Sequence, residues 1–155
     1  MRTVQALAAK ANKDVAAGLA RTFSAMPAEK QTWSPLDEGR TALDQLAECA
    51  VINAWCASVI RDRAVPAFDG EAYKQECDKL DTADKALAAL TTSTDQLVAA
   101  IEGLQDEHLD STVQFPWDSE PSTIGYAALV PYWNMTYHIG QINYIQTLYG
   151  DKQEH

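Results

Sequence analysis

Four stretches of the chain place apolar residues at steps of three and four positions, the spacing that brings side chains to one face of an α-helix. The first stretch shows the pattern at Val4, Leu7, Ala8, Ala11, Val15, Leu19, Phe23 and Met26. Comparable patterns predict three further helices, over residues 38–62, 71–104 and about 123–149. The chain has no convincing strand pattern and no repeat of fixed period. We therefore expect an all-α fold, a four-helix bundle.

The connection before the last helix is much longer than the others. Residues 105–123 are polar and interrupted by prolines, and "TVQF" at residues 112–115 is their only plausible extended piece. A connection of this length suggests a crossover between the third and fourth helices.

The ends of the fourth helix carry recognisable signals. We expect Ser122 or Thr123 to be its N-cap, Pro131 to bend it, and Gly150 to follow its last turn.

Size and charge bound the class of protein. At 155 residues the chain fits one domain, residues 1–155. Its 22 acidic residues outnumber 12 basic ones, and the net charge of −10 would repel the phosphates of a nucleic acid. No apolar stretch could span a bilayer, the N-terminal segment does not resemble a signal peptide, and the three cysteines lack CxxC spacing. We expect a cytoplasmic protein that binds neither nucleic acid nor membrane.

Polar residues interrupt the apolar face of the fourth helix. At 100° per residue, Asn134, His138, Gln141 and Leu148 share one narrow stripe that should point inward. A buried amide or imidazole without a partner costs on the order of 1 to 3 kcal/mol, so another helix should supply the partner. Glu48 is the candidate, because its neighbours on the second helix are mostly apolar. Beside a cation or a protonated histidine its carboxylate would remain ionised, so we expect Glu48 to face His138.

Two segments resemble conserved segments of one protein family. Residues 33–50, "WSPLDEGRTALDQLAECA", resemble the W-x-P connector and the following helix of the DinB-like (DinB/YfiT) superfamily of metal-binding four-helix bundles. Residues 134–151, "NMTYHIGQINYIQTLYGD", resemble its closing signature, approximately H-x-x-x-H-x-G-Q-[IL]. With the spacing between the two segments, the resemblance covers nearly the whole chain and implies a DinB-like topology.

The resemblance also implies a metal site. In that family three histidines hold a divalent metal such as zinc or nickel, and the matching positions here are Glu48, Asn134 and His138. Only His138 keeps the family's residue. Carboxylate and amide oxygens are harder donors than imidazole nitrogens, so we expect weaker zinc binding and a less acidic metal-bound water. Gln141 is expected to support the site rather than to bind the metal.

Two classes of function remain open. The resemblance implies metal-dependent transfer of a small thiol onto an electrophilic small molecule, or a related isomerase or hydrolase reaction. The alternative is a noncatalytic bundle in which Glu48, His138 and Asn134 form a metal-free hydrogen-bonded cluster, and a pocket or a dimer surface carries the function. A homodimer is expected from the resemblance and from the extent of apolar helix surface. Trp55 and Tyr137 are the aromatic residues expected near the site.

Overall fold

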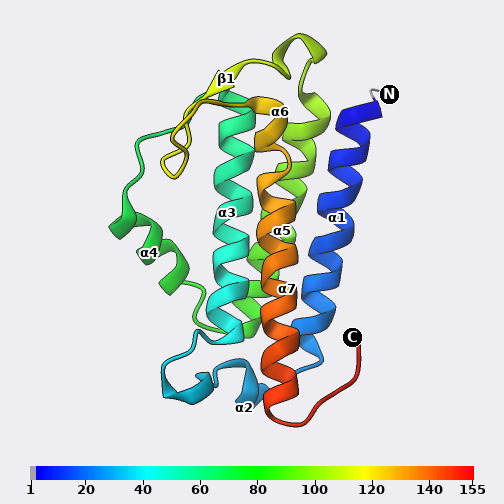
Figure 1. Cartoon of the computed structure of the whole chain (residues 1–155), viewed down its shortest axis with the longest axis vertical. Coiled ribbons are helices and arrows are strands. Elements are labelled where there is room, and N and C mark those ends of the chain that lie inside the picture. Colours follow the sequence, from blue (N-terminus) through cyan, green and yellow to red (C-terminus); the bar gives the residue numbers. More distant parts are fainter. Residues whose placement is uncertain (1–2) are drawn as a thin grey trace.

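Four long helices stand side by side in the computed structural model, which describes residues 3–155 (Figure 1). The long helices are α1 (Thr3–Ser24), α3 (Ala42–Asp62), α5 (Ala83–Gly103) and α7 (Val130–Leu148). The smaller elements are α2 (Ala28–Gln31), α4 (Gly70–Asp78), α6 (Ile124–Ala127), 3-10 turns at Pro35–Asp37 and Asp106–His108, and the strands β1 (Thr112–Val113) and β2 (Ser122–Thr123). The predicted all-α four-helix bundle is confirmed.

Each long helix packs mainly against two others. The α1 helix packs against α5 and α7, and α3 packs against the same two helices, so α1 and α3 occupy opposite corners of the bundle. The connection between α5 and α7 crosses one end of the bundle, as expected from its length (Figure 1). It contains β1, β2 and α6.

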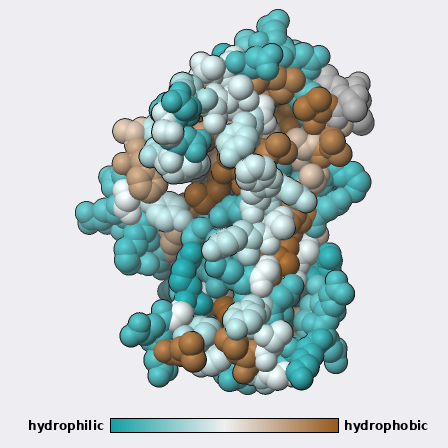
Figure 2. All heavy atoms as spheres, in the orientation of Figure 1, coloured by the Kyte–Doolittle hydropathy of each residue, from teal (hydrophilic) through white to brown (hydrophobic). Residues whose placement is uncertain are grey.

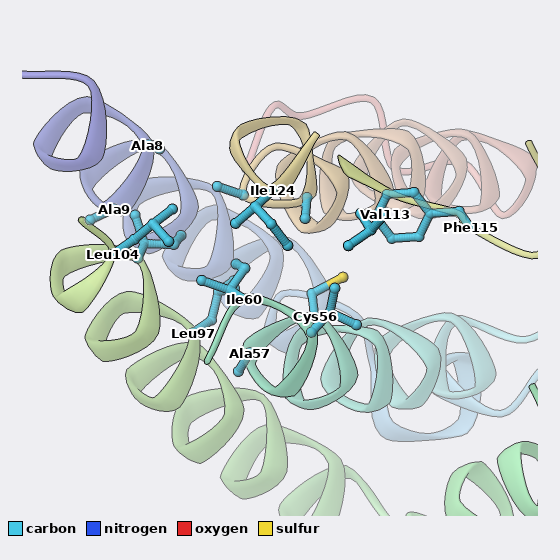
Figure 3. Packing of buried hydrophobic residues seen from close by; sticks show 14 residues of the cluster. Ala8, Ala9, Cys56, Ala57, Ile60, Leu97, Leu104, Val113, Phe115 and Ile124 are labelled. Atoms are coloured by element: carbon cyan, nitrogen blue, oxygen red, sulfur yellow. The ribbon is translucent and has the colours of Figure 1, made fainter. Parts of the chain in front are cut away.

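Two clusters of buried apolar side chains form the core. In the first, Ile60, Leu97 and Ile124 point toward one another between α3, α5 and α6, and Phe115 of the crossover lies beside Val113 on the side of the cluster where Cys56 lies (Figure 3). The second cluster lies toward the other end and includes Phe23, Leu46, Leu90, Met135 and Ile142. Burial of such side chains contributes roughly 1.5 to 3 kcal/mol each, so the two clusters fix how the four helices pack.

The α3 helix begins at a capping box. The hydroxyl oxygen of Thr41 accepts from the Asp44 backbone N–H at 3.0 Å, and the Asp44 carboxylate accepts from the Thr41 N–H at 3.2 Å. The predicted start at residue 38 was therefore a few residues too early. Asp37 and Glu38 resemble the acidic first turn of a helix, but Asp37 has a positive φ and belongs to the preceding turn.

The predicted helix over residues 71–104 is wrong, because this segment forms two helices. The α4 helix ends at Asp78, and Thr82 starts α5 by accepting from the Lys85 backbone N–H at 3.3 Å. Only α5 belongs to the bundle. The α4 helix lies beside α3 and buries none of its own residues.

The predicted fourth helix is also divided. Thr123 caps α6 as expected, by accepting from the Tyr126 N–H at 3.1 Å, and α7 starts anew at Val130. Pro131 therefore lies in the first turn of α7 rather than inside a helix. In a first turn the backbone N–H groups have no partner within the helix, so the N–H that proline lacks costs nothing. Gly150 follows the end of α7 with φ of 97°, as the sequence predicted.

The extended piece predicted at residues 112–115 is confirmed at its first two residues, which form β1 and pair antiparallel with β2. Across residues 3–155, no helix combines the length and the apolar character needed to cross a bilayer.

Candidate polar site at Glu48 and His138

Glu48 of α3 and His138 of α7 meet inside the bundle, as their positions on the two helices predicted. The Nε2 atom of His138 lies 2.9 Å from Oε1 of Glu48. The His138 side chain is 2% exposed and that of Glu48 is 20% exposed. The histidine therefore lies behind the carboxylate, and only Glu48 reaches solvent.

The other ring nitrogen of His138 is also paired. Nδ1 lies 3.1 Å from Oε1 of Gln45 and 2.8 Å from Oε1 of Gln141. Both ring nitrogens therefore lie within hydrogen-bond distance of side-chain oxygens, from Glu48 on one side and from Gln45 and Gln141 on the other. Gln141 supports the histidine, as the sequence predicted. Gln45 was missed, although it lies three residues before Glu48, a spacing that places both on one helix face.

Arg40 is the second residue that the sequence reading missed. Its Nη1 atom lies 2.7 Å from Oε2 of Glu48, so each carboxylate oxygen has its own cationic or donating partner. Arg40 precedes the N-cap of α3. The chain is not helical there, so helical spacing could not predict which way the Arg40 side chain points.

The two partners keep Glu48 ionised. Burial alone would raise the pKa of the Glu48 carboxyl, but the hydrogen bond and charge of His138, followed by those of Arg40, lower it below its ordinary value. At neutral pH the carboxylate is therefore negatively charged.

Asn134 lies one helical turn from His138 but has a different contact. Its Nδ2 atom donates to Sγ of Cys49 at 3.6 Å, a weak hydrogen bond. Burial, and next the charge of Glu48, raise the pKa of the Cys49 thiol well above its ordinary value, so this sulfur stays protonated. Asn134 thus contacts the residue beside Glu48 rather than completing a set of oxygen donors.

The two aromatic residues expected near the site lie in different places. The Tyr137 ring packs edge-on to the His138 ring, with 5.4 Å between their centroids. Trp55 instead packs against Phe115 and Trp117, at 5.9 and 5.6 Å. Only Tyr137 is a neighbour of the site.

Glu48 faces a polar cavity of about 710 Å³ between α3 and α4. Arg40 and Glu48 line one side of it, and Tyr73, Lys74 and Cys77 of α4 line the other. Burial, followed by the charge of Glu48, raises the pKa of Tyr73, and burial raises the pKa of the Cys77 thiol although a hydrogen bond with Tyr73 opposes the shift. Neither group is an activated nucleophile at neutral pH.

The side chains do not fit a zinc or nickel ion. Within residues 3–155, no three His, Cys, Asp or Glu side chains gather closely enough to hold a metal. Both donors that would serve, Glu48 and His138, already bind each other, and the guanidinium of Arg40 brings a positive charge against the carboxylate. To bind a metal ion directly, Glu48 would have to give up Arg40 or His138 as a partner.

Comparisons with known proteins agree on the fold. The family model described as the DinB superfamily matches residues 12–142. YfiT from Bacillus subtilis, described as a probable metal-dependent hydrolase with an unusual four-helix bundle topology, is similar in structure with a TM-score of 0.76. It is 18% identical, and the match covers 97% of this chain and 90% of that chain.

A mycothiol-dependent maleylpyruvate isomerase is also similar, with a TM-score of 0.71 and 13% identity. The match covers 92% of this chain and 63% of the isomerase, so the isomerase contains a large part that has no counterpart here. No protein with a curated description matches the chain.

Proposed function

Because this chain belongs to the DinB superfamily, we propose that it binds a small molecule in the polar cavity between α3 and α4, with Glu48 as the recognising group and no resident metal ion. The observation that carries this proposal is the double pairing of Glu48. His138 holds one carboxylate oxygen at 2.9 Å and Arg40 holds the other at 2.7 Å. Arg40 thus supplies a positive charge beside the carboxylate, and the His138 ring occupies its other oxygen, where a metal ion would otherwise bind.

The charges around the cavity favour a ligand that carries hydrogen-bond donors. Four carboxylates line the cavity against two basic groups, namely Asp44, Glu48, Asp78 and Asp81 against Arg40 and Lys74. Each Glu48 oxygen has a lone pair beyond the one that its present partner uses. An amine is therefore a better ligand for this cavity than a carboxylate.

A comparison of matched ligands tests the proposal. We expect benzylamine to raise the melting temperature of the purified chain more than benzoate does, because binding to the folded state stabilises it. Glu48→Gln should abolish the difference while Glu71→Gln, an exposed carboxylate of α4 outside the cavity, should keep it. Equal shifts for the two ligands, or a preference for benzoate, would contradict the assignment of Glu48.

Metal-dependent transfer of a small thiol is the second candidate function. One feature favours it: His138 and Glu48, which match metal-ligand positions of the family, lie next to each other, although here they hydrogen-bond to each other at 2.9 Å. The description of YfiT as a probable metal-dependent hydrolase supports a metal in the family. Zinc or nickel would require Arg40 to leave Glu48, and the metal content of the purified chain separates the two candidates.

Homodimerisation stays a prediction, and the outer face of α7 is where we place the interface. Trp133, Tyr137, Tyr144 and Leu148 are exposed along this face, and Gly140 lies in the middle of them. The α7 helix contains no Asp, Glu, Lys or Arg, so this face adds no acidic side chain to the repulsion between two copies that each carry a net charge of −10. Figure 2 shows a pale tract of intermediate hydropathy over this helix.

A further inference from the structure

A second cavity lies between α3, α4 and α5 and includes neither Glu48 nor His138. Its volume is about 570 Å³, within the usual range of small-molecule sites. The α4 helix forms one wall but buries none of its own residues, so it does not contribute to the core. In Figure 2 the surface is hollowed between the α4 side of the molecule and the bundle, and hydrophobic atoms line the hollow.

Aromatic rings from four separate segments line this cavity. Trp55 comes from α3, Phe68 from the loop before α4, Tyr73 from α4 and Trp117 from the crossover. The Phe68 ring is 55% exposed and Trp117 is 51% exposed. Large exposed rings around a cavity gain burial and ring contacts when a flat apolar molecule covers them.

The rest of the cavity wall leaves few buried polar groups in need of a hydrogen-bond partner. Ala50 and Ala54 of α3 and Ala89 of α5 are small and leave the space between the rings open. The Ser93 hydroxyl already donates to the Leu90 carbonyl oxygen at 3.2 Å. Among residues 3–155, none of the buried side-chain atoms that lack a hydrogen-bond partner belongs to the cavity wall. A ligand therefore needs no strongly polar group to satisfy the protein.

The charges of the wall disfavour an anion. Asp69 and Glu76 carry two carboxylates, and Lys79 carries the one ammonium group. Asp69 also caps α4, since its carboxylate accepts from the Glu71 and Ala72 backbone N–H groups at 3.0 and 3.1 Å. It is thereby fixed at the cavity, where it would repel a negatively charged ligand.

From the rings, the small residues and the charge of the wall, we propose that this cavity binds an uncharged molecule with flat aromatic rings. The site is separate from the one at Glu48, although Tyr73 and Leu80 line both cavities.

Fluorescence titration of the full chain with N-phenyl-1-naphthylamine, an uncharged aromatic probe, tests this. We expect saturable binding at one site per chain. Thr92 and Thr91 are adjacent exposed residues of α5, and only Thr92 lines the cavity. Thr92→Trp should fill the cavity and weaken binding by at least about tenfold, while Thr91→Trp should leave it within about twofold.

Two further measurements keep the test decisive. If Thr92→Trp fails to fold, Ala54→Trp fills the cavity from α3, with Ala17→Trp on α1 as its matched exposed control. The sulfonated analogue of the probe, 8-anilinonaphthalene-1-sulfonate, should bind about tenfold more weakly because of its negative charge. The proposal is overturned if the uncharged probe does not bind, if cavity-filling and control variants behave alike, or if the sulfonate binds as tightly.

Discussion

Arg40 and Glu48 form an ion pair across the start of α3, with Nη1 of Arg40 2.7 Å from Oε2 of Glu48. The other oxygen of the carboxylate meets the buried ring of His138. Glu48 therefore holds together a loop residue and a residue of α7.

Removing the buried ring should destabilise the fold without any loss of metal. His138→Ala leaves Glu48, Gln45 and Gln141 without their shared partner, and we expect a loss of about 3 kcal/mol in the free energy of unfolding in urea. His108→Ala is the matched control, because His108 is only half-buried and faces Glu107 at 3.8 Å; its effect should stay within about 0.5 kcal/mol. A folded His138→Ala protein that has lost a stoichiometric metal would instead support a metal site.

Metal content should depend on Arg40. We expect the wild-type chain to retain no stoichiometric zinc or nickel, as measured by elemental mass spectrometry after purification without chelators. Arg40→Ala removes the competing guanidinium and should strengthen zinc binding by at least about tenfold in calorimetric titrations. Lys74→Ala is the control, since Lys74 lines the same cavity but pairs with Asp78 rather than Glu48. A wild-type chain that already binds one zinc ion tightly would contradict this prediction.

The contribution of Glu48 to stability should disappear in acid. Its pKa is lower in the folded chain than in the unfolded chain, so the stabilisation is present above the unfolded pKa and is lost as pH falls through the folded pKa. In urea unfolding, the difference between wild type and Glu48→Gln should therefore be largest above about pH 5 and shrink toward about pH 3. Asp62→Asn, an exposed residue paired only with its neighbour Arg61, should show a much smaller change. A difference that grows on acidification would show that Glu48 is not held ionised in the folded state.

Self-association should depend on the outer face of α7. If the chain is a dimer by light scattering, Tyr144→Glu should convert it to a monomer, because a carboxylate would be buried against the partner copy. Tyr144 is 66% exposed, so the substitution costs the single chain little. Thr91→Glu on the exposed side of α5 is the control and should remain dimeric. A wild-type chain that is monomeric at all accessible concentrations would rule out this interface.

Helical spacing was enough to predict the bundle and the meeting of Glu48 with His138. Both residues lie well inside long helices, where the period of 3.6 residues carries a position from one turn to the next. The break between α4 and α5 was missed because Lys79, Asp81 and Thr82 are compatible with a solvent-facing helix. Thr82, with Asp84 in the turn after it, was a signal for a new helix start.

The rotation of α7 about its own axis was harder to predict. Apolar and aromatic residues occur all around this helix, so several faces could have pointed inward. The expected inward stripe included Leu148, which is 43% exposed, whereas Met135 and Ile142 are fully buried. Packing against α1 and α3 decided the rotation, and with it placed Asn134 beside Cys49.

Local backbone preference and the helical period were enough to predict the number of long helices, the helix start at Thr123, the end of α7 before Gly150, and the two polar side chains that share the interior. The contact of Arg40 with Glu48, and the cavity surrounded by aromatic residues from four segments, arise only when the chain is folded. These groups come together because loops bring distant parts of the chain into contact, and the direction of a loop depends on the packing of the helices it joins.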